Sequence, residues 1–369
     1  MRALVKISDF ADVYAGGGAP QNANDFSEDG IPFLRAGSLP KLLNGAKESD
    51  LEKITNEVAK MHRLQLHKKG SVVFAKSGMS ATKGHIYRLK NDCYVVNHLA
   101  VVKPNAICDG KYLEHALKQY SPTSLILDAA YPSIRLSDIS DFKIPLPPLA
   151  QQQRIAEILD KAAEIKVKRE QAIAKLDELA RSTFVEMFGD VKNNVHSFAK
   201  KQLGDLIKLS SGNFLPASNM QENGQYAVYG GNGINGYHDA YMFKERRIVI
   251  GRVGAYCGCV HITNEKAWIT DNALYVDVKD KDLDFDYLAY ALMMANLNSV
   301  SSKSGQPLVS GSRIYPVEIL KPPLSLQQNF ARAKAKIDAL KRGELRGMDD
   351  VIKLTASLQH QAFTIGFNA

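Results

Sequence analysis

Two long stretches of the chain carry apolar residues at alternating steps of three and four, the spacing that aligns one face of an α-helix. They lie within 146–190 and 321–369, and about forty residues of this pattern give a helix of about 60 Å. Because each of the two helices has one apolar face, we expect these faces to pack together in an antiparallel helix pair. Gly343 and Gly347 predict a kink or break in the second helix. The residues expected to pack helix against helix are Ile155, Ile158, Ile165, Leu176, Leu179, Phe330, Ile337, Leu340, Val351 and Leu358.

The remaining regions show the pattern of short strands. Stretches rich in β-branched and aromatic residues are bounded by Gly, Asn, Asp and Lys. They do not alternate regularly with helices, which favours a mostly antiparallel sheet over a doubly wound parallel one. The predicted fold class is α+β, with two similar α/β domains joined by a pair of long antiparallel helices. The predicted strands are 71–75, 94–102, 247–251 and 273–278, with shorter helices at 112–119 and 287–295.

The chain also repeats itself at a shift of about 175 residues. Pro147-Pro148-Leu149 returns as Pro322-Pro323-Leu324, and Gln152 and Gln153 return as Gln327 and Gln328. Collinear matches over more than a hundred residues indicate an internal duplication. Further matches are Tyr112-Leu113 with Tyr287-Leu288, Asn97 with Asn272, 73–75 with 248–250, and, at a shift of 179, Phe184 and Phe188 with Phe363 and Phe367. The predicted domains are 1–145, a central helical spacer at 146–190, a second globular domain at 191–320, and a distal helical spacer at 321–369.

Composition narrows the class of protein. The chain has 369 residues with only four cysteines, and its start has no apolar run that resembles a signal peptide, so we expect a cytoplasmic protein. No apolar run is long enough to predict a membrane span. The formal charge is +8, with 47 basic and 39 acidic residues, and the excess lies mainly in 1–149 and 321–369. This bias permits nucleic acid as a partner without requiring it.

Signatures of catalysis are missing from the sequence. It has no phosphate-binding Gly-x-x-x-x-Gly-Lys loop, no Gly-x-Ser-x-Gly and no His-Glu-x-x-His, and neither Pro-Pro pair has the flanking residues of an amino-methyltransferase motif. Cys257, Cys259 and His261 have side chains that bind zinc, but their alternating spacing also fits one face of a strand, which we favour. His98 is expected to be a buried hydrogen-bonding residue. We predict no catalytic residue and no metal site.

Polar, aromatic and basic side chains instead gather in Gly- and Ser-rich loops. These are the groups that contact DNA, since Arg and Lys bind guanine and phosphate, and Asn and Gln bind adenine. For any single residue we slightly favour a solvated loop surface, whereas the clusters together favour DNA contact. The candidate DNA-binding residues are Arg35, Lys68, Lys69, Lys76, Ser77, Lys83, His85, Tyr131 and Arg135 in the first copy, and Asn213, Tyr226, Tyr229, Asn232, Asn235, Arg246, Arg252, Lys303, Ser304, Gln306 and Arg313 in the second.

The order of these parts resembles one known family. A globular part, then the run from Ile144 to Asp160 (IPLPPLAQQQRIAEILD), then a long helix, all repeated, is similar to the DNA-specificity subunit of Type I restriction-modification systems. The chain departs from that pattern at Gln151, where the family often has Glu, and in its looser distal copy at 322–330. The second departure leaves the spacer length open.

The resemblance implies two target recognition domains, each reading one half of a split double-stranded DNA site. It also implies helices that dock methyltransferase (modification) subunits, two in number, and a restriction or motor subunit. S-adenosylmethionine, ATP and magnesium then belong to those partners, and this chain holds no cofactor itself.

Two other classes of protein stay open at this stage. One is a non-catalytic scaffold or inhibitor whose paired helices bind only proteins, which the small net charge of 191–320 supports. The other is an autonomous enzyme that uses Cys257, Cys259 and His261 with a bound metal.

Overall fold

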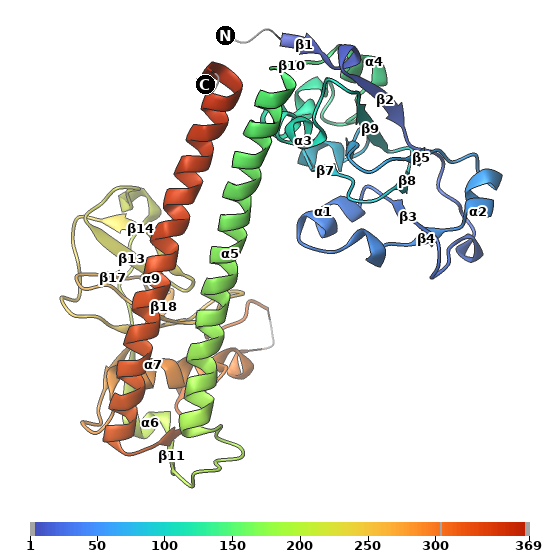
Figure 1. Ribbon diagram of the computed structural model, residues 1–369. Helices are drawn as coiled ribbons and strands as arrows, with labels where there is room; N and C mark the ends of the chain where they lie inside the picture. The colour runs from blue at the N-terminus through green and yellow to red at the C-terminus, as the bar shows by residue number, and fades with distance from the viewer. Residues whose placement is uncertain (1–3, 303–304, 366–369) are drawn as a thin grey trace. The chain divides into compact units, whose positions relative to one another are not determined.

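The computed structural model describes residues 4–302 and 305–365, and it divides into two compact units (Figure 1). Unit 1 comprises Met1–Glu170 and Arg346–Ala369, and unit 2 comprises Gln171–Leu345. The two long helices are α5 (Leu149–Phe188) and α9 (Leu324–His360). Each of them has one part in unit 1 and the other part in unit 2. Among the described residues, no helix is long and apolar enough to cross a membrane.

Unit 1 is built on a four-stranded antiparallel sheet with the strand order β2-β9-β6-β7. A second sheet, ordered β4-β3-β8-β5, contains one parallel pair, β3 with β8, and the short strand β1 pairs with β10. The strands are β1 (Leu4–Lys6), β2 (Ala11–Ala15), β3 (Ile31–Leu34), β4 (Lys53–Ile54), β5 (Leu66–His67), β6 (Val72–Ala75), β7 (Ile86–Arg88), β8 (Cys93–Val95), β9 (Leu99–Pro104) and β10 (Lys143–Pro145). The shorter helices are α1 (Ser38–Leu43), α2 (Asn56–Met61), α3 (Gly110–Gln119) and α4 (Leu136–Asp141).

Unit 2 repeats this plan. Its antiparallel sheet has the order β12-β18-β15-β16, a second sheet ordered β14-β13-β17 again contains one parallel pair, and β11 pairs with β19. The strands are β11 (Ala199–Gln202), β12 (Ile207–Ser211), β13 (Tyr226–Gly230), β14 (Gly233–His238), β15 (Ile248–Gly251), β16 (Val260–Ile262), β17 (Trp268–Ile269), β18 (Ala273–Val278) and β19 (Glu318–Lys321). The shorter helices are α6 (Leu203–Leu206), α7 (Phe285–Met294) and α8 (Gly311–Ile314). The predicted α+β fold with two similar domains is confirmed.

Strand register identifies which residues of the two units are counterparts. Ala75 pairs with Leu99 in unit 1, and Gly251 pairs with Ala273 at the same place in unit 2. The shift is therefore 176 residues at β6 and 174 at β9, so the predicted matches of 73–75 with 248–250 and of Asn97 with Asn272 are each wrong by one residue. Runs of similar β-branched residues fit several registers, and only the hydrogen-bonded ladder decides between them.

A glycine at the end of the first sheet strand supports these assignments. The Gly16 N–H donates to the carbonyl of Leu99, and the Gly212 N–H donates to that of Ala273, each at 3.2 Å. A Cβ atom at Gly16 would lie 2.2 Å from the carbonyl oxygen of Val95, and one at Gly212 would lie 2.3 Å from that of Ile269. Both units therefore need glycine here because the backbone approaches so closely.

A buried glutamine joins each globular part to its long helix. Gln152 is fully buried, and its Oε1 accepts a hydrogen bond from the Asp109 N–H at 2.8 Å. Its Nε2 donates to the carbonyl oxygens of Ile107 at 2.9 Å and of Pro147 at 2.8 Å. One side chain thus satisfies three backbone groups that no regular element pairs.

Unit 2 contains the same arrangement. Gln327 is fully buried, accepts from the Asp284 N–H at 2.8 Å, and donates to the carbonyls of Asp282 at 3.1 Å and Pro322 at 2.7 Å. The repeated Gln at a shift of 175 is therefore a structural residue, which explains why the motif after Pro-Pro-Leu occurs in both copies.

Two buried tyrosines strengthen the same junctions. The Tyr112 hydroxyl donates to the carbonyl of Pro145 at 2.6 Å, and the Tyr287 hydroxyl donates to that of Leu320 at 2.7 Å. Because each tyrosine lies on the helix that follows the main sheet, these bonds fasten α3 and α7 to the strand before each long helix.

Aromatic rings fill the space beside these tyrosines. In unit 2, Phe184 stacks on Tyr287 with ring centroids 5.8 Å apart, and Phe330 contacts Phe184 at 5.2 Å. In unit 1, Phe363 lies 5.7 Å from the ring of Tyr112. The match of Phe184 with Phe363 is thus a shared packing position, whereas Phe367 lies outside the described residues.

The helix–helix contact differs from the predicted one in part. Ile155 and Phe330 are buried in the cores of units 1 and 2, Ile337 is buried, and Ile158, Leu176, Val351 and Leu358 are half-buried. Ile165, Leu179 and Leu340 are exposed by 45%, 47% and 61%, so their predicted place in this contact is wrong. A strict 3.5-residue repeat drifts by about 20° per heptad around a helix of 3.6 residues per turn, which carries such residues out of the contact. The break predicted from Gly343 and Gly347 is also wrong, because α9 is continuous through both.

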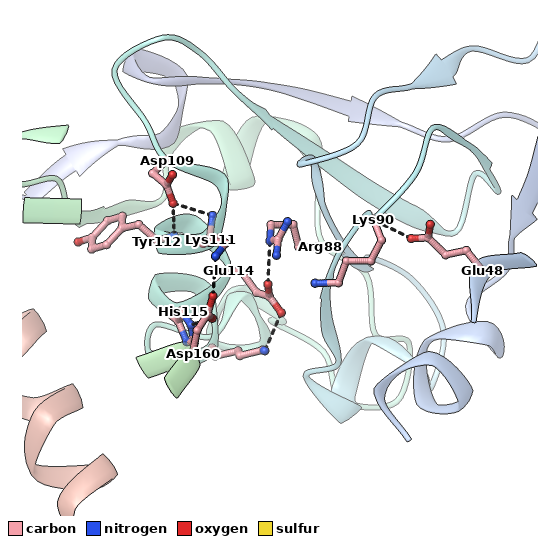
Figure 2. A network of polar contacts seen from close by, with 10 residues as sticks. Glu48, Arg88, Lys90, Asp109, Lys111, Tyr112, Glu114, His115 and Asp160 are labelled. Atoms are coloured by element: carbon pink, nitrogen blue, oxygen red, sulfur yellow. Dashed lines mark hydrogen bonds and ion pairs between the residues drawn. The ribbon is translucent and has the colours of Figure 1, made fainter. Parts of the chain in front are cut away.

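A polar network, shown in Figure 2, fastens α3 to its surroundings in unit 1. Glu114 pairs with Arg88 on β7 at 3.2 Å and with Lys118 at 2.8 Å. Although burial opposes ionisation of this carboxyl, the nearby cations keep the pKa of Glu114 below its ordinary value. The next residue of α3, His115, lies 2.8 Å from the carboxylate of Asp160 on α5, and Lys111 lies 3.0 Å from it (Figure 2).

Unit 2 has different side chains in place of this network. The counterparts of Arg88, His115 and Asp160 are Ile262, Tyr290 and Ala335 by strand register and helix position. The Tyr290 ring lies 5.2 Å from the ring of Phe330. Lys334 also lies over the Tyr290 ring and pairs with Asp338. The repeat therefore preserves the backbone plan while changing the side chains that contact it.

Candidate nucleic-acid interface

Three segments meet where β6 ends in unit 1. The Lys76 N–H donates to the carbonyl of His98 at 2.9 Å, and the Lys76 carbonyl accepts from the Ile134 N–H at 2.8 Å. The next residues continue the contact, since the Gly78 N–H donates to the carbonyl of Pro132 at 2.9 Å. Lys76 is therefore fixed between the turn that connects β8 to β9 and the segment before α4.

The same bonds recur in unit 2 around an arginine. The Arg252 N–H donates to the carbonyl of Asn272 at 3.0 Å, and the Arg252 carbonyl accepts from the Val309 N–H at 2.8 Å. The Gly254 N–H then donates to the carbonyl of Pro307 at 2.9 Å. Lys76 and Arg252 are thus counterparts, and each unit holds one cation at the same backbone position.

We call these segments the reading loops: 76–85, 96–98 and 131–135 in unit 1, and 252–259, 270–272 and 306–310 in unit 2. Tyr131 is 83% exposed, and its counterpart Gln306 is also exposed. The structure places six predicted residues of unit 1 on these loops: Lys76, Ser77, Lys83, His85, Tyr131 and Arg135. Their side chains are exposed or half-buried, as contact with a macromolecule requires.

Other predicted residues of unit 2 adjoin its reading loops. A Cβ atom at Gly231 would lie 3.3 Å from the Asn272 carbonyl oxygen, which places the turn that carries Asn232 beside the loops. The Asn235 side chain covers Gly230 at the base of this turn. Asn213 is exposed after β12, and its carbonyl accepts from the Trp268 indole at 3.2 Å.

Several predicted residues lie at the other end of the strands. Lys68 and Lys69 precede β6, where Asp92 accepts from the Lys68 ammonium at 2.8 Å and from the Lys69 N–H at 2.9 Å. Arg246 precedes β15 and lies 3.5 Å from the Asp286 carboxylate. The prediction counted these cations among the DNA-binding candidates, and the length of a strand separates them from the reading loops.

Four further candidates have different surroundings again. Arg35 is partly exposed after β3, with its Nε donating to Glu52 at 2.7 Å and its guanidinium over the ring of Phe26. Tyr226 begins β13, and its ring packs on the ring of Tyr241. Arg313 is exposed on α8, and its guanidinium donates to the Val300 carbonyl. Tyr229 is buried, and its hydroxyl accepts a hydrogen bond from the Asn264 N–H. DNA contact by the Tyr229 side chain is therefore a wrong prediction, because the ring belongs to the core. Lys303 and Ser304 lie outside the described residues.

Sequence reasoning missed His98. We expected it to be buried in an apolar strand, but the strand ends at Val95, and His98 is exposed on the turn before β9. Its Nδ1 lies 2.8 Å from the Ser77 hydroxyl. The signal available in the sequence was the polar Asn97-His98 pair that interrupts two apolar runs, which is typical of a turn.

Cys257, Cys259 and His261 do not converge. Cys257 is buried in the core of unit 2, Cys259 is exposed, and burial lowers the pKa of the half-buried His261. Over 4–302 and 305–365, no three His, Cys, Asp or Glu side chains are placed to share a metal ion.

Comparison with known proteins gives a consistent result. The family model described as "Type I restriction modification DNA specificity domain" matches residues 3–178 and 196–345. A curated relative, the Type I restriction enzyme EcoprrI specificity subunit of Escherichia coli, is 27% identical over 226 residues, which cover 58% of this chain and 56% of the relative. The chain spans about half the length of the curated relatives it matches.

Solved structures share the fold over nearly the whole chain. The crystal structure of a Type-I restriction-modification system S subunit from M. genitalium has a TM-score of 0.66 at 15% identity, covering 98% of this chain and 96% of that one. A chain from a structural study of complex assembly and conformational transition of the type I R-M system has a TM-score of 0.57 at 17% identity, with coverage of 99% and 98%.

Proposed function

The chain belongs to the Type I restriction modification DNA specificity domain family, and from this premise we propose that it is the DNA-recognition subunit of a type I restriction-modification complex. Each unit reads one half of a split double-stranded site through its reading loops. The observation that carries this proposal is the pair of counterpart cations, Lys76 and Arg252, held by the same backbone bonds in both units. A lysine or arginine in such a place binds phosphate or guanine.

The proposal assigns catalysis to other subunits. This chain directs methyltransferase subunits, two per complex, and a restriction or motor subunit to the site that it recognises. S-adenosylmethionine, ATP and magnesium are used by those partners. The apolar residues Ile165, Leu179 and Leu340 are exposed on the long helices and are available for such docking.

The proposal divides the chain by role. Residues 1–145 and 191–320 are the two target recognition domains, and 146–190 and 321–369 are the helical spacers. The bounds of α5 and α9 support this division, since each helix begins within three residues of a Pro-Pro pair.

Binding to duplex DNA as a function of salt tests the proposal. Removing one phosphate contact lowers the slope of log affinity against log salt by about one. We expect Lys76→Ala and Arg252→Ala each to reduce this slope, whereas Lys68→Ala, at the opposite end of β6, leaves it unchanged. Wild-type affinity that does not change with salt, or equal losses in all three variants, would contradict DNA reading by these loops. A chain that binds only proteins would show no affinity for the duplex.

A further inference from the structure

One exposed polar side chain stands beside the counterpart cation in each unit. The carbonyl of His98 accepts from the Lys76 N–H, and the carbonyl of Asn272 accepts from the Arg252 N–H. His98 and Asn272 each precede the first residue of the next strand, Leu99 or Ala273, and both are exposed. They are therefore counterparts, although the sequence repeat at a shift of 175 matches Asn272 with Asn97.

The backbone at this position is held firmly in unit 1. The Asn97 N–H donates to the carbonyl of Gly17 at 2.7 Å, and the Leu99 N–H donates to that of Val96 at 3.0 Å. Ser77 and Ser133 form a β-bridge that brings in the segment before α4. A side chain on a backbone fixed by several segments can present its polar atoms in one geometry, as base recognition requires.

The two side chains offer different hydrogen-bonding patterns. In unit 1 the Ser77 hydroxyl engages Nδ1 of His98 at 2.8 Å, so Nε2 is the ring nitrogen that remains for a base. In unit 2 the counterpart of Ser77 is Val253, which bridges Leu308. Asn272 has a carboxamide, which offers a donor and an acceptor together. A carboxamide matches the edge of adenine, whereas a single imidazole nitrogen makes one bond to a base edge.

We propose that His98 and Asn272 are the base-reading residues at one equivalent position of the two half-sites, beside the phosphate that Lys76 or Arg252 contacts. Ser77 is a positioning residue that orients the His98 ring. This inference rests on the proposed function and adds the identity of the reading side chains. It predicts that the two half-sites differ at this position because the two side chains differ.

A double variant that copies the unit 2 position into unit 1 tests this directly. Ser77→Val with His98→Asn gives unit 1 the side chains that stand at 253 and 272. The full-length chain, in complex with the modification subunits of its own system, is used to select from a duplex library randomised over both half-sites. We expect the half-site read by unit 1 to acquire, at one position, the base preferred by unit 2, with a change in preference of about tenfold or more. The other half-site and the gap stay unchanged.

The reciprocal and control variants make the outcome decisive. Asn272→His is expected to alter one position in the other half-site only. His196→Asn, the same chemical change on the exposed segment between α5 and β11, is expected to leave both half-sites unchanged. The midpoint of thermal unfolding verifies that each variant folds.

Two results distinguish a failure of this inference from a failure of the proposed DNA-recognition function. If the wild-type complex selects a split site and the folded double variant selects the same bases, or only binds every sequence more weakly, then His98 does not read a base and the inference is overturned. If the wild-type complex selects no sequence at all, the proposed function fails with it.

Discussion

In each unit, one buried side chain makes several of the hydrogen bonds that join the globular part to its long helix. Gln152 is the clearest case, because its amide satisfies one N–H and two carbonyl groups that have no partner in a strand or helix. Since the same three bonds recur at Gln327, this residue type follows from geometry rather than from contact with a ligand.

Replacing Gln152 by Leu is expected to destabilise the protein strongly. The change keeps an apolar stem but leaves three buried backbone groups unpaired, and each unmet group costs about 1–3 kcal/mol. We expect a loss of about 3 kcal/mol or more in the free energy of unfolding, measured by denaturant titration. Gln153→Leu, on the exposed side of the same helix turn, is the control. Equal midpoints for the two variants would show that the buried amide contributes nothing.

The burial of His115 makes unit 1 sensitive to acid. Burial lowers the pKa of His115 below its ordinary value of 6.5, although Asp160 opposes this shift. The unfolded chain therefore takes up a proton near pH 6.5 that the folded chain resists, so stability is full above that pH and falls as the pH drops below it. His67, whose pKa burial also lowers, adds to the same trend.

His115→Gln is expected to reduce this dependence on pH. We expect the thermal midpoint of the variant to change less between pH 7.5 and about 5 than that of the wild type, because the contribution of His115 is lost. His196→Gln, at an exposed position, should retain the wild-type slope. An unchanged slope in His115→Gln would mean that His115 does not couple folding to pH.

At the scale of elements, the long helices and the duplication could be predicted, whereas registers and exposures could not. Periodic apolar positions and two Pro-Pro pairs locate α5 and α9 to within a few residues. The strict heptad spacing nevertheless placed Leu340 in the helix contact, since sequence does not show how a straight helix drifts from a 3.5-residue repeat.

The candidate site shows the same limits. Residue types singled out Lys76 and Arg252, but their equivalence depends on hydrogen bonds between distant segments. The sequence matched Asn97 with Asn272, which hid the relation of Asn272 to His98. The glycines after Tyr229 suggested a loop, but Tyr229 lies in a paired strand and its ring is buried in the core.

The glycines of α9 offer a test at this scale. Gly343 has open space where a Cβ would lie, so Gly343→Ala should stabilise the helix by up to about 1 kcal/mol. At Gly347 the added Cβ would lie 2.4 Å from the guanidinium of Arg169, which must move, so Gly347→Ala should gain less or nothing. Thermal unfolding of the two variants decides this, and a larger gain at Gly347 would contradict the packing described here.

At the scale of the whole molecule, the chain repeats one structural plan twice with different side chains. The main sheets share one strand order, and the reading loops share their backbone bonds, while Lys76, Ser77 and His98 become Arg252, Val253 and Asn272. A conserved frame with exchanged loop residues is what two independent half-site readers require. The central claim is therefore that each unit reads its own half of one split DNA site.

Exchanging one recognition domain and mapping the methylated sites tests this claim most directly. Residues 1–145 are replaced by the equivalent segment of another member of the family, and long-read sequencing maps DNA methylation in cells that carry the complete system. We predict that one half of the recognised sequence changes while the other half and the gap between them stay the same. If both halves change together, or if the methylated sites do not change at all, the account is wrong.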